Sequence, residues 1–412
     1  MIFIACVVFL AVFITTRYLL FRKPSDSTCK SLNEIPCPGS IPILGNICDM
    51  FYNDGESWKK RRKLLTKNFH FAALHNYMEI FNKEGQKLGD RLQKDVNQST
   101  DILELISHST LKIINEILVG EELKLREIQI KDYVSAIDTF SKAIGYINSK
   151  PILSLVYKYS EMKKEEDRSL EIINTFAKDL LKNWKVKPSD NPRVLDVMLD
   201  APSLYDDQGV MDEIITFIFA GNSTSSAGLL YALFNLANHS EYQDEVYEEI
   251  VQIVGEKEKP SYADLKSMSF LDRFLRESMR LYPPAPFIGR TIAEDVVTKT
   301  GYRIPAGTEV VFHIFDIHRS PFIYDNPDTF DPDRFLPENS KKRHPFSYLP
   351  FSAGPRNCIA QKFALLEIKS SICKILKKFK LEPVTLAEDI KFIPDVTLAT
   401  KEKIKIKLIS RS

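Results

Sequence analysis

The sequence predicts a mainly helical protein with a smaller β region, preceded by one transmembrane helix. Helical patterning dominates from about Asp101 to Leu281, strand-like stretches gather in the C-terminal third, and an almost wholly apolar segment opens the chain. With 412 residues, 44% of them hydrophobic, the chain is long enough for one large core or two ordinary ones.

Residues 1–21 form the apolar segment, and as a helix they would span roughly 30 Å, about the thickness of a hydrocarbon core. Arg17, Arg22 and Lys23 lie at its end, and because positive charge tends to stay cytosolic, we expect the rest of the chain on the cytosolic side. The segment lacks a basic start and an evident small-x-small site, which favours an uncleaved signal-anchor over a cleaved signal peptide.

Residues 22–45 are predicted to form a proline-rich hinge, in which Pro38 and Pro42 stiffen the chain because proline fixes φ. Residues 46–412 then make up the globular domain. Its charge is close to balance, since the whole chain carries a formal charge of +1, and nothing indicates a nucleic-acid partner. Six cysteines without regular spacing argue against a disulfide scaffold or zinc site and for a reducing compartment: residues 6, 29, 37, 48, 358 and 373.

Secondary structure in the C-terminal half follows from periodicity. Strand-like stretches lie at Asp295–Phe315, with a Pro-Ala-Gly turn at 305–307, and at Lys403–Ile409, where apolar residues alternate. The stretch from Ala360 to Lys380 is predicted to be one helix.

An amphipathic helix is also predicted before Pro283 and Pro284. In it, Glu277 and Arg280 are three residues apart, so their side chains share one helix face and can form an ion pair.

The segment from Phe351 to Cys358 has the composition that a haem-bound thiolate requires. The N-terminus of the following helix supplies positive potential to the Cys358 sulfur, and Gly354 permits a tight turn against a flat ligand. Phe351 can shield the sulfur from water, and Arg356 can bind a haem propionate. These features favour an axial ligand of haem iron over a lone structural cysteine.

The run Phe351-Ser-Ala-Gly-Pro-Arg-Asn-Cys358-Ile-Ala360 resembles the haem-binding loop of the cytochrome P-450 superfamily, the haem-thiolate monooxygenases. Ala360 stands where the family usually has Gly. The resemblance implies the family's helical haem domain, haem as cofactor with Cys358 as the metal ligand, and insertion of one oxygen atom of O2 into a lipophilic substrate.

The segment from Asp212 to about His239 resembles the helix that crosses the distal face of the haem in this family. The resemblance implies that Ala220 and Gly221 allow close approach to the porphyrin and that Thr224 holds the water that delivers protons to dioxygen. Ser223 stands where the family usually has Asp or Glu, and a hydroxyl offers no titratable acid. Ala220 replaces a glutamate that some fatty-acid ω-hydroxylases bond covalently to haem, so we expect non-covalent haem.

The pattern Trp58-x-x-x-Arg62 resembles the family helix whose Trp and Arg contact a haem propionate, and Arg290 resembles a further propionate partner. A basic run surrounds Arg62, and on the resemblance it either forms a docking face for an acidic electron donor or is simply a solvated face: Lys59, Lys60, Arg61, Lys63 and Lys67.

The segment Asn326–Phe335 resembles the family's meander, whose arginine joins the Glu-x-x-Arg pair. The resemblance therefore implies a structural triad of Glu277, Arg280 and Arg334 that supports the haem loop. Asp333 stands where the family often has Glu.

The resemblance also shows a gap. Only a dozen residues separate Gly45 from Trp58, where the family has several tens more, and we expect the missing strands to leave a sheet edge open near Thr308–Phe315.

The implied partners are an NADPH-dependent reductase, with cytochrome b5 as an optional second donor, at the endoplasmic reticulum membrane, with the catalytic domain facing the cytosol. The implied substrates are fatty acids, hormones or foreign lipophiles. Two alternatives stay open: an inactive haem-binding or non-folding variant, and an enzyme that rearranges peroxides without outside electrons.

Overall fold

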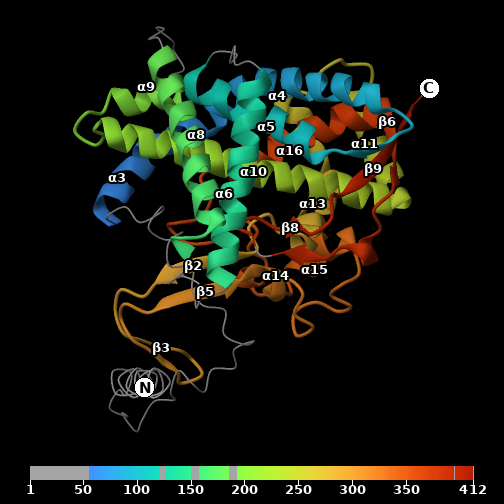
Figure 1. Ribbon diagram of the computed structural model, residues 1–412. Helices are drawn as coiled ribbons and strands as arrows, with labels where there is room; N and C mark the ends of the chain where they lie inside the picture. The colour runs from blue at the N-terminus through green and yellow to red at the C-terminus, as the bar shows by residue number, and fades with distance from the viewer. Residues whose placement is uncertain (1–54, 121–126, 150–156, 185–192, 394, 412) are drawn as a thin grey trace, which may run out of the picture. The chain divides into compact units, whose positions relative to one another are not determined.

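The computed structural model describes residues 55–120, 127–149, 157–184, 193–393 and 395–411. Helices account for most of the described residues, as predicted (Figure 1). The α-helices are α3 (Gly55–Leu65), α4 (Phe71–Leu92), α5 (Leu103–Val119), α6 (Glu127–Ser149), α8 (Glu161–Asn183), α9 (Val194–Leu199), α10 (Asp207–Asn238), α11 (Ser240–Val254), α12 (Tyr262–Ser267), α13 (Ser269–Leu281), α14 (Ile314–Ile317), α15 (Pro337–Ser340) and α16 (Gln361–Lys378). Short 3-10 turns lie at η2 (Thr66–Phe69), η3 (Gln93–Asp95), η5 (Pro332–Phe335), η6 (Pro345–Ser347) and η7 (Ala387–Asp389).

The strands are short and form small sheets. They are β1 (Ser99–Asp101), β2 (Phe287–Thr291), β3 (Val296–Val297), β4 (Arg303–Ile304), β5 (Glu309–His313), β6 (Phe379–Pro383), β7 (Phe392–Ile393), β8 (Ala399–Thr400) and β9 (Lys405–Ser410). A three-stranded sheet has the order β1-β9-β6, and the other strands pair as β2-β5, β3-β4 and β7-β8. The predicted strand at Lys403–Ile409 is β9, antiparallel to β6 with Leu381 opposite Leu408.

The described chain divides into two units. The smaller unit holds Gly289–Val311, and the larger unit runs through Ile288 and resumes at Phe312. In the smaller unit the predicted turn at 305–307 is present, with Gly307 at a φ of 78°. The predicted strand of this region stops at His313 rather than Phe315, because α14 begins at Ile314.

An open sheet edge is present where it was expected. Among the described residues β5 pairs with β2 alone, and Val311 and Phe312 remain 44% and 41% exposed.

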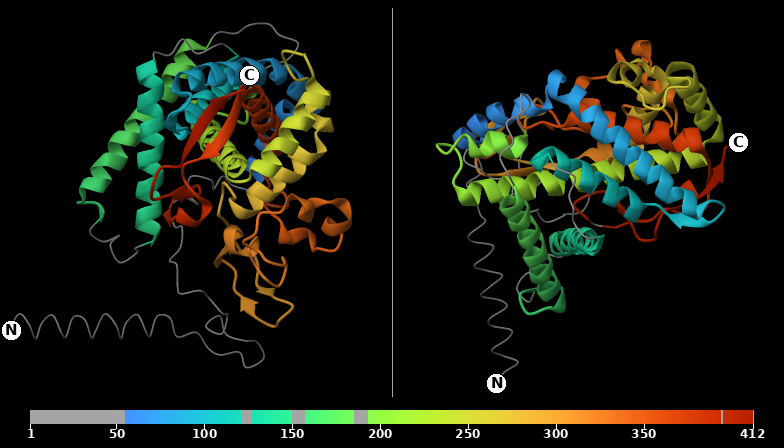
Figure 2. Two further views of the ribbon diagram at one scale, coloured as in Figure 1. Left: turned by 90° about the vertical axis from the view of Figure 1, so that its right-hand side faces the viewer. Right: turned by 90° about the horizontal axis from the view of Figure 1, so that it is seen from above.

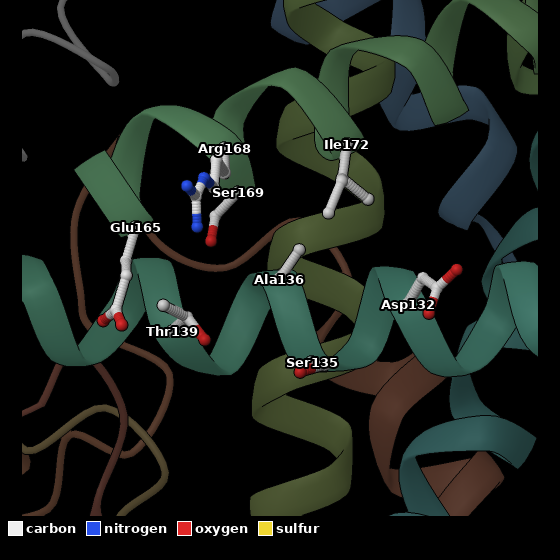
Figure 3. Close-up of a pocket in the computed structure, with 8 residues that line it drawn as sticks. All are labelled: Asp132, Ser135, Ala136, Thr139, Glu165, Arg168, Ser169 and Ile172. Carbon is white, nitrogen blue, oxygen red and sulfur yellow. The ribbon is translucent and has the colours of Figure 1, made fainter. Parts of the chain in front are cut away.

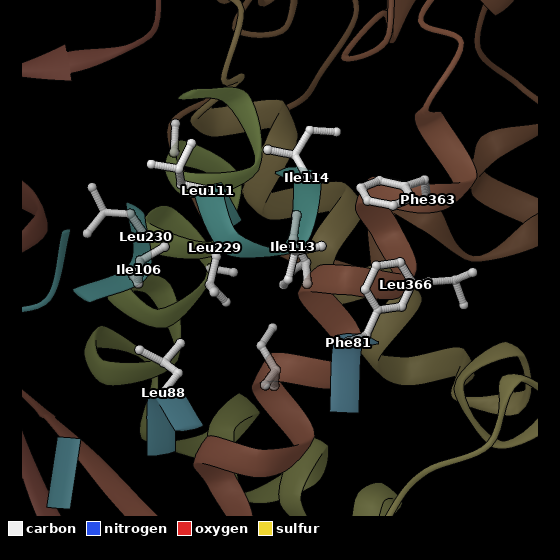
Figure 4. Close-up of a cluster of buried hydrophobic side chains, with 14 of the residues drawn as sticks. Phe81, Leu88, Ile106, Leu111, Ile113, Ile114, Leu229, Leu230, Phe363 and Leu366 are labelled. Atoms are coloured by element: carbon white, nitrogen blue, oxygen red, sulfur yellow. The ribbon is translucent and has the colours of Figure 1, made fainter. Parts of the chain in front are cut away.

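The core of the larger unit lies where α4, α5, α10 and α16 pack together, and both views of Figure 2 show these helices side by side. Figure 4 shows Phe81 of α4, Ile113 of α5, Leu229 of α10 and Leu366 of α16 converging in this core. The long helix α10, with 32 residues, is buried over most of its second half, which explains its lack of a polar face.

A side-chain cap fixes the start of α10, whereas α16 starts without one. The Asp206 carboxylate accepts the Gly209 N–H at 2.8 Å at the start of α10. At the other end of the chain, α16 begins directly after the haem-loop sequence and carries Lys377 and Lys378 in its last turn, where positive charge favours the helix dipole.

The predicted membrane anchor (residues 1–21) and proline-rich hinge (residues 22–45) lie outside the described residues. Among the helices that the structure describes, none is both long and apolar enough to cross a bilayer.

Candidate functional site

The Phe351–Cys358 segment folds back on itself immediately before α16. The Cys358 N–H donates to the Phe351 carbonyl at 3.0 Å, so the two ends of the loop meet. Ser352 and Gly354 adopt positive φ values of 60° and 80°. A Cβ on Gly354 would meet no protein atom within 4 Å, so glycine is needed here for its backbone conformation and the space beside it is open.

Cys358 is a free cysteine, and the positive charge of Arg62 acts on its thiol. Part of its side chain is exposed, yet the protein around the sulfur raises the pKa of the thiol above its ordinary value by desolvation. The Ala360 N–H and the Arg62 charge act in the opposite direction and lower that pKa. A bound metal cation would lower the pKa of this thiol much further, because a coordinating thiol is deprotonated outright.

Helix α3 holds two of the predicted haem contacts against this loop. Arg62 donates from Nη1 to the Asn357 carbonyl at 2.9 Å and from Nη2 to the Asn357 side-chain oxygen at 3.0 Å. The Arg356 guanidinium lies 3.8 Å from the centre of the Trp58 ring. The structure therefore brings Trp58, Arg62 and Arg356 together at the Phe351–Cys358 loop, and the propionate contacts expected of them stay a prediction.

The basic run on this helix divides into two sets. Arg61 turns inward, where it stacks on Tyr205 at 4.5 Å, donates to the Leu204 carbonyl at 3.1 Å and lies 3.9 Å from Glu213. Arg61 therefore does not belong to an exposed docking face, because these contacts hold its charge inside the molecule. The exposed set is Lys59, Lys60, Lys63 and Lys67.

Helix α10 places the predicted distal residues at different angles. The Thr224 hydroxyl donates to the Ala220 carbonyl at 2.7 Å, and Ala220 is exposed while its neighbours on the helix are half-buried or buried. The Ser223 hydroxyl oxygen is buried and has no hydrogen-bond partner among the described residues. Protein atoms therefore cover this hydroxyl, and the proton-relay role expected of Ser223 stays a prediction.

Gly221 has a helix-packing role that the sequence did not predict. A Cβ at this position would lie 2.9 Å from both Cδ1 and Cγ1 of Ile114 on α5. Gly221 therefore allows α10 to approach α5, and the approach to a porphyrin expected at Ala220 and Gly221 stays a prediction.

The structural triad is assembled in the interior. Arg280 forms two hydrogen bonds to Glu277, at 2.6 Å from Nε and 2.8 Å from Nη2, and both side chains are fully buried. The Arg334 Nε lies 3.4 Å from Glu277 Oε1. Arg280 also donates to the carbonyls of His318 and Pro327 at 2.8 Å and 2.6 Å, so the helix α13 holds the meander through charge-assisted bonds.

His318 links this triad to the haem loop, a role that was not predicted from the sequence. Its Nε2 accepts the Leu349 N–H at 2.8 Å, two residues before Phe351, and its Nδ1 lies 3.2 Å from the Arg280 carbonyl. Burial lowers the pKa of His318 to about 4, which keeps the ring neutral. The only sequence signal was a histidine near the meander, and nothing in its spacing indicates this contact.

Two further features do not form part of these contacts. Arg290 lies on β2 in the smaller unit, where its Nη1 donates to the Gly289 carbonyl at 2.7 Å, and its predicted propionate contact stays a prediction. A cavity of about 310 Å³ between α6 and α8 has a polar lining that includes Asp132, Glu165 and Arg168, and none of the predicted site residues lines it (Figure 3).

The residues around Cys358 fit a haem group. They offer one free thiol, two nearby cationic groups, an open space at Gly354 and an aromatic side chain, Phe351, packed between the loop and the core. This donor set matches a haem-bound thiolate with cationic partners for the propionates.

Comparisons with known proteins agree with this geometry. A family model described as Cytochrome P450 matches residues 39–408. "Probable cytochrome P450 4ac1" from Drosophila melanogaster is 33% identical over 389 residues, which covers 90% of this chain and 75% of that protein. "Cytochrome P450 4V2" from Homo sapiens is 34% identical over 399 residues with the same coverage. The crystal structure of a mutant cytochrome P450DA heme domain has a TM-score of 0.75 at 23% identity, and covers 88% of this chain and 80% of that one.

Proposed function

Because the chain belongs to the cytochrome P450 family, we propose that it hydroxylates a lipophilic substrate with haem held by Cys358. Family membership makes the chain a monooxygenase of the oxidoreductase class with haem as its cofactor. The single observation that carries the ligand assignment is the folded Phe351–Cys358 loop, with a free thiol beside the Arg62 charge.

The residues around the thiol have separate tasks. Bound haem supplies the activation of dioxygen that inserts one oxygen atom into the substrate. Cys358 holds the iron, while the Ala360 N–H and Arg62 stabilise the negative charge of its sulfur. Trp58, Arg62 and Arg356 hold the propionates, and the triad with His318 fixes the loop from behind.

On the distal side, the Thr224 hydroxyl donates to the Ala220 carbonyl, so its Oγ can accept a hydrogen bond from the water that delivers protons. Ser223 contributes little to this path, because its hydroxyl is buried without a partner among the described residues. Proton delivery therefore depends on Thr224 and on water, and Ala220 leaves the haem without a covalent carboxylate bond.

The substrate class, the electron donor and the location follow from the family resemblance. We place fatty acids first, with hormones and foreign lipophiles as further candidates, and an NADPH-dependent reductase as the donor. Residues 1–21 would anchor the chain in the endoplasmic reticulum membrane with its catalytic part in the cytosol. Alkaline carbonate extraction of membranes tests the anchor, since full-length chain should stay with the membranes and a variant lacking residues 2–21 should not.

The deciding experiment compares wild type with Cys358→Ala in the carbon-monoxide difference spectrum of the reduced protein. Wild type should show the red-shifted band of thiolate-bound haem, and the variant should lose it. Cys373→Ala is the matched control, because this buried cysteine contacts the Met268 sulfur at 3.7 Å and lies outside the haem loop. Retention of the band in Cys358→Ala would reject the ligand assignment.

Turnover assays then distinguish an active monooxygenase from the two alternatives, an inactive haem-binding variant and a peroxide-rearranging enzyme. Product from a fatty acid, formed with NADPH and reductase, would support a monooxygenase. A thiolate band with no turnover on any lipophile would favour the inactive haem-binding variant, for which the short spacing between Gly45 and Trp58 is the motivating observation. Conversion of a lipid hydroperoxide without reductase would indicate the peroxide-rearranging enzyme.

A further inference from the structure

Glu367 on α16 is a buried acid that the mechanism above does not use. Its side chain is 1% exposed, and its Oε2 accepts a hydrogen bond from the Ser225 hydroxyl at 2.7 Å. The other carboxyl oxygen is buried without a partner among the described residues. A carboxylate ion with one hydroxyl donor would be poorly stabilised here, so the geometry suits a neutral carboxyl group. Burial accordingly raises the pKa of Glu367 to about 8.

This hydrogen bond lies in the contact between the two helices that carry the site. Ser225 directly follows Thr224 on α10, and Glu367 lies on α16, the helix that follows Cys358. The helices approach closely at the same place, because a Cβ on Gly228 would lie 2.9 Å from Ile368 Cδ1. Gly228 is three residues after Ser225 and therefore lies on the same helix face.

The neighbouring charged groups are engaged elsewhere. The helices α4, α10, α11 and α12 and the strand β6 pack against α16. Burial raises the pKa of Glu367 and the hydrogen bond from Ser225 lowers it to a smaller extent. No charged group contributes to this shift. Charged groups on α16 and on the elements packed against it have partners of their own: Glu84 pairs with Lys87, Glu249 accepts the Phe270 N–H, Asp264 accepts the Ser261 N–H, Glu382 pairs with Lys407, Lys369 donates to the Leu265 carbonyl, and Lys374 donates to the Glu258 carbonyl.

We propose that the Glu367–Ser225 hydrogen bond positions α10 on α16 and thereby sets Thr224 relative to Cys358. The proposal rests on the function proposed above. Glu367 is then a positioning residue, which acts through the helix contact and touches neither substrate nor haem. Because a neutral carboxyl suffices, Glu367→Gln should retain the contact, whereas Glu367→Leu and Ser225→Ala should lose it.

The matched control is Ser226→Ala. The Ser226 hydroxyl is also buried and lies 2.7 Å from the Thr110 hydroxyl of α5, so its removal costs a comparable interhelical bond on the other side of α10. Loss of stability alone should be similar in Ser225→Ala and Ser226→Ala. Only Ser225→Ala should alter the placement of Thr224.

The readout is the infrared stretching frequency of carbon monoxide bound to the reduced holoenzyme, which responds to polar groups on the distal side. We expect wild type, Glu367→Gln and Ser226→Ala to share one frequency, and Glu367→Leu and Ser225→Ala to show a shifted or broadened band. An unchanged band in Glu367→Leu would make the contact merely structural and overturn the proposal. An equal shift in Ser226→Ala would overturn it as well, because the effect would then not belong to this contact.

If wild type shows no thiolate band, the proposed function fails, but the Glu367–Ser225 hydrogen bond can still be tested by its effect on stability. In a double-mutant cycle of urea unfolding, Glu367→Leu and Ser225→Ala should be non-additive, and additivity would overturn the contact.

The neutral state of Glu367 has its own pH test. Between about pH 4.5 and 8 the unfolded chain has lost this proton and the folded chain retains it. Wild type should therefore lose stability relative to Glu367→Gln as the pH rises through this window, by roughly tenfold in the unfolding constant per pH unit. A constant difference between the two proteins across this range would contradict the neutral state.

Discussion

Five consecutive polar residues of α10 show how single side chains divide the work of the site. Asn222 and Ser226 form hydrogen bonds to α5, Ser225 to α16, and Thr224 to the Ala220 carbonyl. Successive helical residues point about 100° apart, so neighbours in sequence face different parts of the molecule. The sequence predicted a proton-delivery role for Thr224 and Ser223 of this run, and the structure shows that Asn222, Ser225 and Ser226 instead bind neighbouring helices.

The buried Glu277–Arg280 pair gives a residue-scale prediction. Arg280→Met should destabilise the protein by about 3–5 kcal/mol, because it removes the two short bonds to the buried Glu277 carboxylate and leaves it with Arg334 alone. Arg276→Met on the same helix is the control, since the Arg276–Asp272 pair is half exposed and its loss should cost about 1 kcal/mol or less. Urea unfolding monitored by circular dichroism measures both, and equal costs would refute the structural importance of the triad.

His318 predicts a sensitivity to acid. The folded protein keeps this ring neutral down to about pH 4, whereas the unfolded chain binds a proton at about pH 6.5. Stability is therefore fully present above about pH 6.5 and declines as the pH falls toward 4, by about 3 kcal/mol in total.

His318→Gln should reduce this loss, because the glutamine oxygen can still accept the Leu349 N–H but does not titrate. Unfolding midpoints of both proteins at pH 7 and pH 5 measure the effect. A parallel decline in the variant would assign the acid sensitivity to other groups.

At the scale of elements, close helix contacts decide where the site residues lie. α10 approaches α5 at Gly221 and α16 at Gly228, and at both places a Cβ would come within 2.9 Å of an isoleucine. The helices α5 and α16 thus hold α10 at two places, and Ser223, Thr224 and Ser225 lie between these two places along the helix. The distal residues are thus held by packing as much as by hydrogen bonds.

Gly221→Ala tests this packing. The added methyl would collide with Ile114, and overpacking of this kind costs about 1–3 kcal/mol. Ile114→Val removes the Cδ1 atom and should restore part of the loss in the double variant, so that the two effects are non-additive. Thermal unfolding of the single and double variants would show it, and additive losses would exclude a direct contact.

At the scale of the whole molecule, charge on α3 bears on the encounter with a reductase. Lys60 and Lys63 are exposed, while Arg62 on the same helix reaches the haem loop, so a donor docked on these lysines would be close to the proximal side. The double variant Lys60→Glu/Lys63→Glu should slow reduction by the reductase at low salt and weaken the dependence of the rate on ionic strength. Stopped-flow reduction measures this rate.

Lys178→Glu, on the exposed surface of α8, controls for charge reversal elsewhere on the molecule. If Lys178→Glu slowed reduction as strongly as the double variant, the exposed lysines of α3 would be an ordinary solvated face.

Much of this protein was predictable from sequence. Periodicity predicted the helical region from about Asp101 to Leu281, the helix α16, the strand β9 and the turn before β5, because these depend on local spacing of apolar residues and on proline and glycine. The resemblance of the Cys358 loop and of the Glu277–Arg280 helix to family motifs identified the cofactor and its ligand, and the contacts among Glu277, Arg280 and Arg334 are those it implied.

Tertiary structure alone decided the rest. The inward turn of Arg61, the packing of Gly221 on Ile114, and the partners of His318 and Glu367 depend on residues that lie far away in the sequence. A residue's neighbours along the chain fix its helix or strand, but the element that covers it fixes its partners, its burial and its charge state. The sequence by itself therefore determined the fold class and the cofactor chemistry, and the packing of α10 between α5 and α16 decided which polar residues serve the site.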